Sequence, residues 1–381
     1  MFCHGLRILY GKRLFKQNKL MKNNIILFIQ GLGSGGAERQ LCGLAIMLQK
    51  RGYNVKVVTY SKNQFYEPLL NDAGVDYELM PKLRNKWLRP WRMARVIREH
   101  KVDVVIGFLP MVCMAACMGK PFYKAKLIVG ERNTNQSLSI KDKLLFTLYK
   151  NADIIIPNSY SQGRFISTHY PNLAKKVHVI TNFVDTEKFC PSTNPTRQEG
   201  ILTVLTVGRY TEQKNLFNYL KAIKILKEKG EKVHFLWYGN KNSDDSIYNE
   251  VATLVVNYGI AKMVELRDHS TDVESLYQQA DIFLLPSLYE GFPNVLCEAM
   301  SSGLPVACSN VCDNPIIVSD GVNGFLFSPQ VPEEIAGAIM KLAKKNVDDR
   351  LQMGYSNRKK IIKLCSPDSF VNRYIEVIEH L

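Results

Sequence analysis

The 381-residue chain is longer than one hydrophobic core usually organises, so we expect two domains. Its 46% hydrophobic and 22% charged residues exclude a disordered or fibrous protein. The net charge of +15 at pH 7 indicates an acidic partner: nucleic acid, an anionic membrane or a phosphorylated substrate. The alternative is a basic, solvated surface without such a partner.

The nine cysteines include no CxxC pair and no clustered histidine, which argues against a disulfide framework or a zinc site and favours a reducing cytoplasm. Cys113 and Cys117 are four residues apart, as are Cys308 and Cys312, so each pair is expected to be small buried residues able to share a helix face. No apolar run reaches the roughly 18 residues that span a bilayer.

Residues 1–22 form a basic extension without the small-residue cleavage site of a signal peptide. We expect the native start at Met21, directly before the first strand. The alternative is that this extension is a basic amphipathic membrane anchor.

Strand-like and helical segments alternate from residue 23 to 190, which predicts a first α/β domain with a parallel sheet. The expected strands are 25–29, 54–60, 102–108, 127–130, 153–157 and 177–180, and the expected helices are 38–51, 91–100 and 140–151. The stretch 185–200 is rich in Pro, Ser and Asn and breaks every period, so a linker is placed at 191–199.

The alternation restarts and predicts a second domain over residues 200–365. The expected strands are 202–207, 233–238, 264–266 and 282–286, the expected helices are 216–229, 247–259, 273–280 and 332–344, and further elements are expected at 297–302, 305–309 and 316–320. Residues 366–381 carry Phe370, Tyr374 and Ile378 on one stripe, so this helix must pack on something. The strand carboxyl ends of two such domains would face a shared cleft, where open α/β sheets bind ligands.

The glycine-rich segment 31–36 follows the first strand and has the GxGxxG spacing. Nicotinamide cofactors are disfavoured because the next strand ends without the carboxylate that would hold a ribose. Gly35 and Gly36 still let the backbone approach a ligand, and the N–H groups that open the following helix favour an anion. A tight turn is the alternative.

The sequence EGFPNVLCEAMSSGLPV at 290–306 follows a strand and places two carboxylates eight residues apart. Glu298 would lie inside a helix, where a carboxylate suits the paired hydroxyls of a ribose, and Glu290 in the loop suits a sugar. Asn294 and Val295 open that helix, whose amino end can face a diphosphate although Pro293 supplies no N–H.

Arg209 and Lys214 lie in the loop after the first strand of the same domain. A guanidinium can bind phosphate oxygens with two hydrogen bonds, and a lysine supplies a point charge. Together with the two glutamates, these cations describe a pocket for a nucleoside-diphosphate sugar.

These motifs, with the segments 281–287 and 320–329, resemble the retaining glycosyltransferases of family 4, which have the GT-B fold of two Rossmann-like domains facing a cleft. The segments 35–39 and 182–185 resemble the same family, and the match covers roughly residues 25–381. The resemblance implies that Arg209 and Lys214 neutralise the donor diphosphate, Glu298 holds the ribose and Glu290 contacts the sugar. It also implies that the C-terminal helix crosses back to the first domain.

Many members of the family carry a histidine in the first domain, and the matching stretch of this chain has Arg132 and Asn133 instead. These two residues are candidates for contacts with the donor sugar or the acceptor. A structural role is the alternative. The resemblance implies no cofactor, and because side-chain cations neutralise the diphosphate and no DxD triplet is present, we predict that no divalent metal is required.

The predicted reaction is transfer of a hexose or N-acetylhexosamine, most simply from a UDP-sugar, to a glycan or polyprenyl-linked acceptor in surface polysaccharide, lipopolysaccharide or capsule synthesis. We expect a cytoplasmic protein without a nucleic-acid partner, peripheral on the anionic inner face of the plasma membrane, with its acceptor near Trp87, Trp91 and the Cys113 helix. The alternatives are a nucleotide-sugar epimerase or phosphorylase of the same fold and a non-enzymatic module that binds anionic polymer or membrane.

Overall fold

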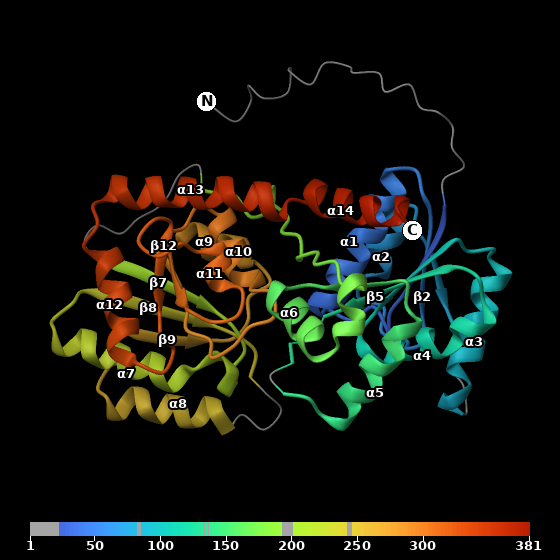
Figure 1. Cartoon of the computed structure of the whole chain (residues 1–381). Helices are drawn as coiled ribbons and strands as arrows, with labels where there is room; N and C mark the ends of the chain where they lie inside the picture. The colour runs from blue at the N-terminus through green and yellow to red at the C-terminus, as the bar shows by residue number, and fades with distance from the viewer. Residues whose placement is uncertain (1–22, 82–84, 133, 136, 193–200, 242–245) are drawn as a thin grey trace, which may run out of the picture.

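The computed structural model describes residues 23–81, 85–132, 134–135, 137–192, 201–241 and 246–381. The predicted extension 1–22, residues 193–199 of the predicted linker and the candidate Asn133 lie outside the described residues. The described chain forms two α/β units that stand side by side (Figure 1).

The first unit is built on a six-stranded parallel sheet in the order β3-β2-β1-β4-β5-β6. The strands are β1 (Asn24–Phe28), β2 (Asn54–Thr59), β3 (Asp76–Leu79), β4 (Val104–Phe108), β5 (Lys126–Glu131) and β6 (Ile154–Pro157). They are rich in Val and Ile because helices cover both faces of the sheet. The strand order reverses between β1 and β4, which is the point at which such sheets bind ligands at their carboxyl edge.

Its helices are α1 (Gly36–Lys50), α2 (Glu67–Asp72), α3 (Arg89–Glu99), α4 (Pro110–Gly119), α5 (Ile140–Leu148) and α6 (Tyr160–His169), with the short 3₁₀ turns η1 (Lys86–Leu88), η2 (Lys120–Phe122), η3 (Tyr149–Asn151) and η4 (Pro171–Lys176). Proline in the first turn fixes the start of α3 and α4. Cys113 and Cys117 lie on α4 and are both buried.

The second unit repeats this plan with the strand order β12-β11-β10-β7-β8-β9. Its strands are β7 (Leu202–Val207), β8 (Val233–Tyr238), β9 (Val264–Arg267), β10 (Ile282–Leu285), β11 (Val306–Ser309) and β12 (Gly324–Phe327). Its helical segments are η5 (Glu212–Lys214), α7 (Leu216–Glu228), α8 (Ser246–Asn257), α9 (Val273–Gln279), α10 (Asn294–Ser301), α11 (Asn314–Ile317), α12 (Pro332–Ala343) and α13 (Val347–Cys365). The predicted fold class, two parallel-sheet α/β domains, is confirmed.

Two details of the prediction are wrong. Residues 177–180 form no strand: Val177 makes a single bridge to Ile155, and the His178 and Ile180 amides donate to the Ile155 and Pro157 carbonyls of β6 at 2.9 and 3.2 Å without forming a continuous ladder. Cys308 and Cys312 share no helix, because Cys308 lies in β11 and Cys312 lies in a turn with a φ of 49°.

The last residues that the prediction assigned to the first domain pack against the second domain. Val184 and Phe189, which the prediction assigned to the first domain, pack in the core of the second domain. The Arg358 guanidinium of α13 donates to the Phe189 and Thr186 carbonyls at 3.0 and 3.1 Å. The crossing between the domains therefore starts before the predicted linker.

The C-terminal helix α14 (Pro367–Glu379) returns to the first domain, and Figure 1 shows α13 and α14 running along one side of both units. Its apolar stripe of Phe370, Tyr374 and Ile378 is buried in the core beneath α1. Arg51, which directly follows α1, pairs with Asp368 of α14 at 2.7 Å. This helix therefore connects the end of the second domain back to the first domain.

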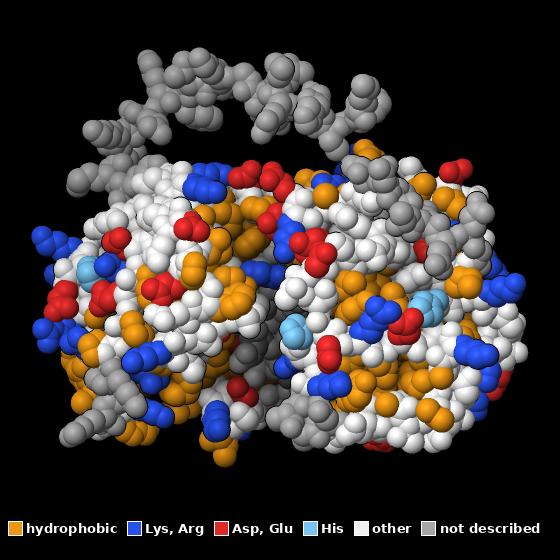
Figure 2. Space-filling model, turned by 180° about the vertical axis from the view of Figure 1, so that it is seen from behind, with side chains coloured by type: hydrophobic (Ala, Val, Ile, Leu, Met, Phe, Trp, Pro, Cys, Tyr) orange, Lys and Arg blue, Asp and Glu red, His pale blue; other side chains and the backbone are white. Residues whose placement is uncertain are grey.

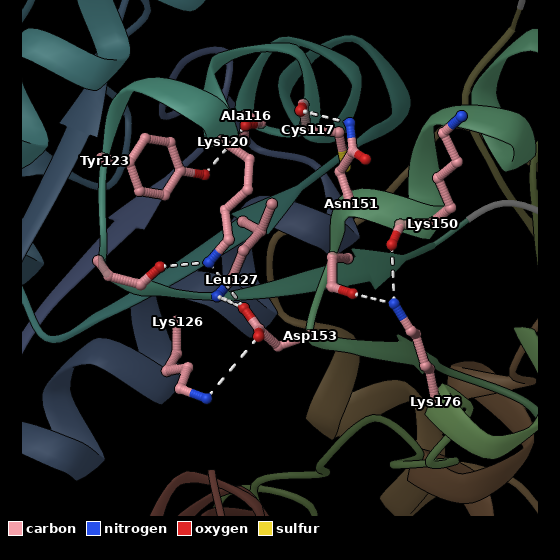
Figure 3. A network of polar contacts seen from close by, with 12 residues as sticks. Ala116, Cys117, Lys120, Tyr123, Lys126, Leu127, Lys150, Asn151, Asp153 and Lys176 are labelled. Carbon is pink, nitrogen blue, oxygen red and sulfur yellow. Dashed lines mark hydrogen bonds and ion pairs between the residues drawn. The ribbon is translucent and has the colours of Figure 1, made fainter.

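A polar network at the amino edge of the first sheet fixes the far end of α4 (Figure 3). The Asp153 carboxylate accepts from the Lys120 ammonium at 2.9 Å and from the Leu127 amide at 2.8 Å. Burial alone would raise the pKa of Asp153, but these hydrogen bonds and the nearby lysines hold the pKa below its ordinary value. The Tyr123 hydroxyl donates to the Ala116 carbonyl of α4 at 2.9 Å.

Among the described residues, no helix is both long and apolar enough to cross a bilayer.

Candidate active site

The carboxyl edges of the two sheets face each other across a polar cleft of about 570 Å³, and Figure 2 shows the molecule hollowed between the domains. Residues of both domains line this cleft: Gly36, Ala37, Arg132, Thr134, Asn135, Asn158, Asn182, Arg209, Gln213, Tyr289, Glu290, Gly291, Phe292 and Asn294. Of the predicted site residues, this wall includes Gly36, Arg132, Arg209, Glu290 and Asn294. Gly35, Lys214, Val295 and Glu298 are not part of it.

Lys214 lies behind Glu290 and pairs with it. The Lys214 ammonium donates to Glu290 Oε1 at 2.5 Å, and the Ser287 hydroxyl donates to the same oxygen at 2.6 Å. Both charged side chains are almost buried, with 13% and 8% of their surface exposed. Each charge therefore depends on the other for compensation.

The loops that carry these two charges are joined to each other. The Leu288 amide donates to the Gln213 carbonyl at 2.8 Å, and the Gln213 side chain donates to the Tyr289 carbonyl at 2.9 Å. Asn215 follows Lys214 with a φ of 62°, and its side-chain amide donates to the Pro286 and Pro329 carbonyls at 3.0 and 2.6 Å. The positions of Lys214 and Glu290 are thus set by one rigid unit.

Arg209 is exposed on the cleft wall, in the same loop as Lys214. The backbone before it packs tightly on the neighbouring strand: a Cβ added to Gly239 would lie 1.9 Å from the Gly208 carbonyl oxygen. Only glycine at position 239 permits this approach. Gly239 thereby helps to set the direction in which Arg209 enters the cleft.

Glu298 lies inside α10 and is buried at the contact between the domains. Its Oε1 accepts from the Arg39 guanidinium of α1 at 2.8 Å, and its Oε2 accepts from the Tyr277 hydroxyl at 3.1 Å. Burial alone would lower the pKa of Arg39, but the Glu298 carboxylate raises it above its ordinary value. Burial and the same carboxylate hold the pKa of Tyr277 well above its ordinary value, so Tyr277 stays a hydrogen-bond donor.

Arg132 is the centre of a hydrogen-bond chain that crosses the cleft. Its guanidinium donates to the Tyr374 hydroxyl of α14 at 2.5 Å and to Asn182 Oδ1 at 3.1 Å. Asn182 in turn donates to Asn294 Oδ1 at 3.0 Å. The Arg132 guanidinium also lies 3.9 Å from the centroid of the Phe108 ring. Arg132 is therefore held by α14 and, through Asn182, linked to the second domain.

Three further polar residues were missed by the sequence reasoning. Asn158 follows β6 on the cleft wall, and its side-chain oxygen is buried without a hydrogen-bond partner in the described structure. Asn135 pairs with Gln162 of α6 at 2.7 Å. Asp313 accepts from the Tyr160 and Ser161 amides at 2.7 and 2.8 Å and so attaches the amino end of α6 to the second domain. Of these three residues, Asn158 alone has a sequence feature that could have pointed to it, which is its position directly after a predicted strand.

The cleft wall combines the guanidinium groups of Arg132 and Arg209 with the nearly buried carboxylate of Glu290, which suits a ligand that is both anionic and rich in hydroxyl groups. Within the part of the chain that the structure describes, no group of three or more His, Cys, Asp or Glu side chains could hold a metal ion.

Comparison with known families gives two matches that together cover most of the chain. Residues 34–188 match the family described as Glycosyltransferase Family 4, and residues 193–360 match Glycosyl transferases group 1.

Two bacterial relatives have names that state an activity. An alpha-1,4-N-acetyl-D-galactosaminyltransferase of Campylobacter jejuni, whose name gives a diphospho-undecaprenol-linked acceptor, is 27% identical over 288 residues, which is 72% of this chain and 76% of the relative. An Escherichia coli UDP-Gal:alpha-D-GlcNAc-diphosphoundecaprenol alpha-1,3-galactosyltransferase is 27% identical over 210 residues, which is 50% of this chain and 53% of the relative.

Among solved structures, Anabaena HepE in complex with UDP and glucose superposes with a TM-score of 0.80 at 17% identity, covering 94% of this chain and 100% of that chain. A glycosyltransferase from Rickettsia africae gives a TM-score of 0.80 at 17% identity, covering 95% and 99%. These likenesses support the predicted GT-B fold.

Proposed function

Because this chain belongs to the family 4 glycosyltransferases and has the GT-B fold, we propose that it transfers a sugar from a nucleoside-diphosphate donor, with retention of configuration, to a lipid-linked glycan. The observation that carries this proposal is the presence of Arg209 and Glu290 on the wall of one cleft between the domains, with Lys214 paired to Glu290 from behind. It places cations for a diphosphate next to a buried carboxylate for a sugar.

The donor spans the second domain in this proposal. Arg209 and Lys214 bind the diphosphate, Gly35, Gly36 and the amino end of α10, with Asn294 and Val295, face it, and Glu298 accepts hydrogen bonds from the ribose hydroxyls. Glu298 can accept further hydrogen bonds because a carboxylate offers about four acceptor positions, and Arg39 and Tyr277 occupy one each. UDP is the expected nucleotide, since the E. coli relative is named for a UDP-sugar.

The chemical step breaks the bond between the anomeric carbon and the diphosphate oxygen through an oxocarbenium-like transition state. The bonding electrons leave with the diphosphate, whose growing charge is stabilised by Arg209 and Lys214. The acceptor hydroxyl attacks from the face that the diphosphate leaves, and its proton passes to the departing oxygen, so the configuration is retained. Because the cations are side chains, we propose that no divalent metal is needed.

The acceptor binds on the first domain, where Arg132 and Asn158 face the cleft. The C. jejuni and E. coli relatives are both named for acceptors linked to undecaprenyl diphosphate. We therefore propose a polyprenyl-diphosphate-linked glycan as acceptor, used at the cytoplasmic face of a membrane in surface polysaccharide synthesis.

Ligand-induced thermal shift with UDP, GDP, ADP and their sugars, with and without EDTA, tests the donor site. We expect a shift with one nucleotide that EDTA leaves unchanged, that Glu298→Ala abolishes and that Glu333→Ala, an exposed glutamate on α12, retains. Incubation with that donor and a diphospho-lipid-linked sugar should give a product whose new linkage has the donor's anomeric configuration. No shift with any nucleotide would refute the proposal, and conversion of the donor sugar without an acceptor would indicate an epimerase.

A further inference from the structure

An apolar groove outside the cleft lies between η1–α3 and α4. It encloses about 260 Å³ and is lined by Trp87, Pro90, Met111, Met114 and Met118, with Lys86 and Arg89 at its edge. Methionine side chains adapt their shape to flexible apolar ligands. The groove thus suits a hydrocarbon chain better than a polar substrate.

Large hydrophobic side chains stand exposed around this groove. Trp87 is 74% exposed, Met111 52%, Leu88 and Trp91 50% each, and Phe122 45%. The rings of Trp91 and Phe122 lie 6.0 Å apart, so the exposed aromatics continue from α3 to η2. Single exposed hydrophobic residues are ordinary, but a contiguous group marks a surface that binds a partner or a membrane.

The charge around the groove is positive. Lys86 and Arg89 edge it, and α3 adds Arg92, Arg95 and Arg98, against one acidic residue, Glu99, which pairs with Arg95 at 2.7 Å. Tryptophan beside basic residues is the composition found where proteins meet the headgroup region of anionic bilayers. An acidic protein surface would complement the arginines but would leave the exposed hydrocarbon groove unfilled.

We propose that these residues, the α3–α4 surface, dock the protein on an anionic phospholipid bilayer, with Trp87, Leu88, Trp91 and Phe122 below the phosphates and an acyl chain in the groove. This inference rests on the proposed function, because it explains how the enzyme reaches a lipid-linked acceptor. It assigns the membrane contact to described residues of the first domain.

The position of the α3–α4 surface in the fold supports this role. Met111 lies in the first turn of α4, just after β4 ends at Phe108, and the Phe108 ring carries Arg132 of the cleft. The Arg89 guanidinium lies 3.8 Å from the ring centroid of Tyr60, which follows β2. Both walls of the groove therefore begin at the carboxyl edge of the sheet, which is the edge that faces the cleft. Docking there brings the cleft toward the bilayer and the diphosphate of its acceptor.

Co-sedimentation of the full chain with vesicles tests the proposal. We expect binding to phosphatidylcholine vesicles that contain phosphatidylglycerol, weak binding to pure phosphatidylcholine, and loss of binding by at least about tenfold in Trp87→Ser/Trp91→Ser. Tyr355→Ser removes a side chain of similar exposure, 66%, from α13 of the second domain and should bind like the wild type. Equal vesicle binding by the tryptophan variant and the wild type would overturn the proposal.

Tryptophan emission gives a second readout. The chain has three tryptophans, and Trp237 is fully buried in the second domain, so a blue shift on adding anionic vesicles reports Trp87 and Trp91. No blue shift in the wild type would contradict insertion of these side chains. If the surface binds a protein partner and not a bilayer, the emission should stay unchanged on adding lipid.

The docking proposal can fail separately from the proposed function. Trp87→Ser/Trp91→Ser should keep the nucleotide-induced thermal shift and lose vesicle binding, whereas Glu298→Ala should lose the thermal shift and keep vesicle binding. A nucleotide shift in the wild type without vesicle binding would refute the α3–α4 surface alone.

Discussion

Removing the charge of Lys214 tests whether the cleft depends on a mutually compensated pair. Lys214→Met keeps the aliphatic stem but leaves Glu290 with a buried charge whose remaining side-chain partner, among the residues that the structure describes, is the Ser287 hydroxyl. Removing one partner of a buried pair costs about 3–5 kcal/mol in other proteins. With 8–13% of each side chain still exposed and the Ser287 bond retained, we expect the lower end, about 3 kcal/mol, in the free energy of unfolding of the second domain.

A double-mutant cycle isolates the pair. Lys214→Met/Glu290→Gln should recover about 2 kcal/mol of that loss, because neither charge is then left without compensation. Urea unfolding followed by the emission of the buried Trp237 measures each variant. Lys224→Met breaks the exposed Lys224–Glu228 pair, whose side chains are 47% and 61% exposed, and should cost no more than about 0.5 kcal/mol. Additive effects at Lys214 and Glu290 would refute the reasoning.

Three other changes give distinct readouts. Glu298→Gln should weaken UDP binding about 10- to 100-fold in titration calorimetry, because charge-assisted hydrogen bonds to the ribose are lost, and unchanged affinity would remove the ribose role from Glu298. Gly239→Ala should lower the free energy of unfolding of the second domain by about 1–3 kcal/mol, since its Cβ would lie 1.9 Å from the Gly208 carbonyl oxygen. The control Gly337→Ala on α12 should be neutral or stabilising, because a Cβ there meets nothing within 4 Å. Because its pKa is lowered in the folded state, Asp153 stabilises the first domain at pH values above its unfolded pKa of about 3.9 and loses this effect as the pH falls through its folded pKa. Asp153→Asn should therefore flatten the acid side of a stability–pH profile, and an unchanged slope would contradict the Figure 3 network.

The sequence predicts the central strands of the two sheets well because these strands are runs of Val, Ile and Leu bounded by turn residues, but it misses the edge strands β3 and β12. It misses α13, a 19-residue helix, because few of its apolar residues repeat at helical spacing. Met353, Ile361 and Cys365 of this helix are buried in the core. Polar contacts add to them: Asn357 accepts from Asn323 at 2.9 Å, and Arg358 donates to the Ser301 carbonyl at 2.6 Å. Such contacts depend on partners far along the chain and leave no local pattern.

The candidate site divides in the same way. Arg209 and Glu290 lie on loops after strands, where the topology alone directs them to the cleft. Asn182 and Asp313 are used because the two domains meet at one particular angle, which no segment of sequence encodes by itself. The burial of Glu298 under Arg39 likewise becomes visible only when both domains are in place.

The Arg39–Glu298 contact makes donor binding and the contact between the domains share one carboxylate. Because Arg39 and Tyr277 leave acceptor positions on Glu298 free, Arg39→Gln should change the Kd of UDP less than about threefold. The same change removes an ion pair between α1 and α10, so turnover with acceptor should fall by about tenfold as the domains lose a contact that holds the acceptor side over the donor. Arg51→Gln is the matched control, since Arg51 directly follows the same helix, is 39% exposed against 38% for Arg39, and pairs with the exposed Asp368. If Arg39→Gln instead weakens UDP binding as much as Glu298→Gln does, then Arg39 belongs to the ribose site itself, and the contact between the domains is a consequence of that role.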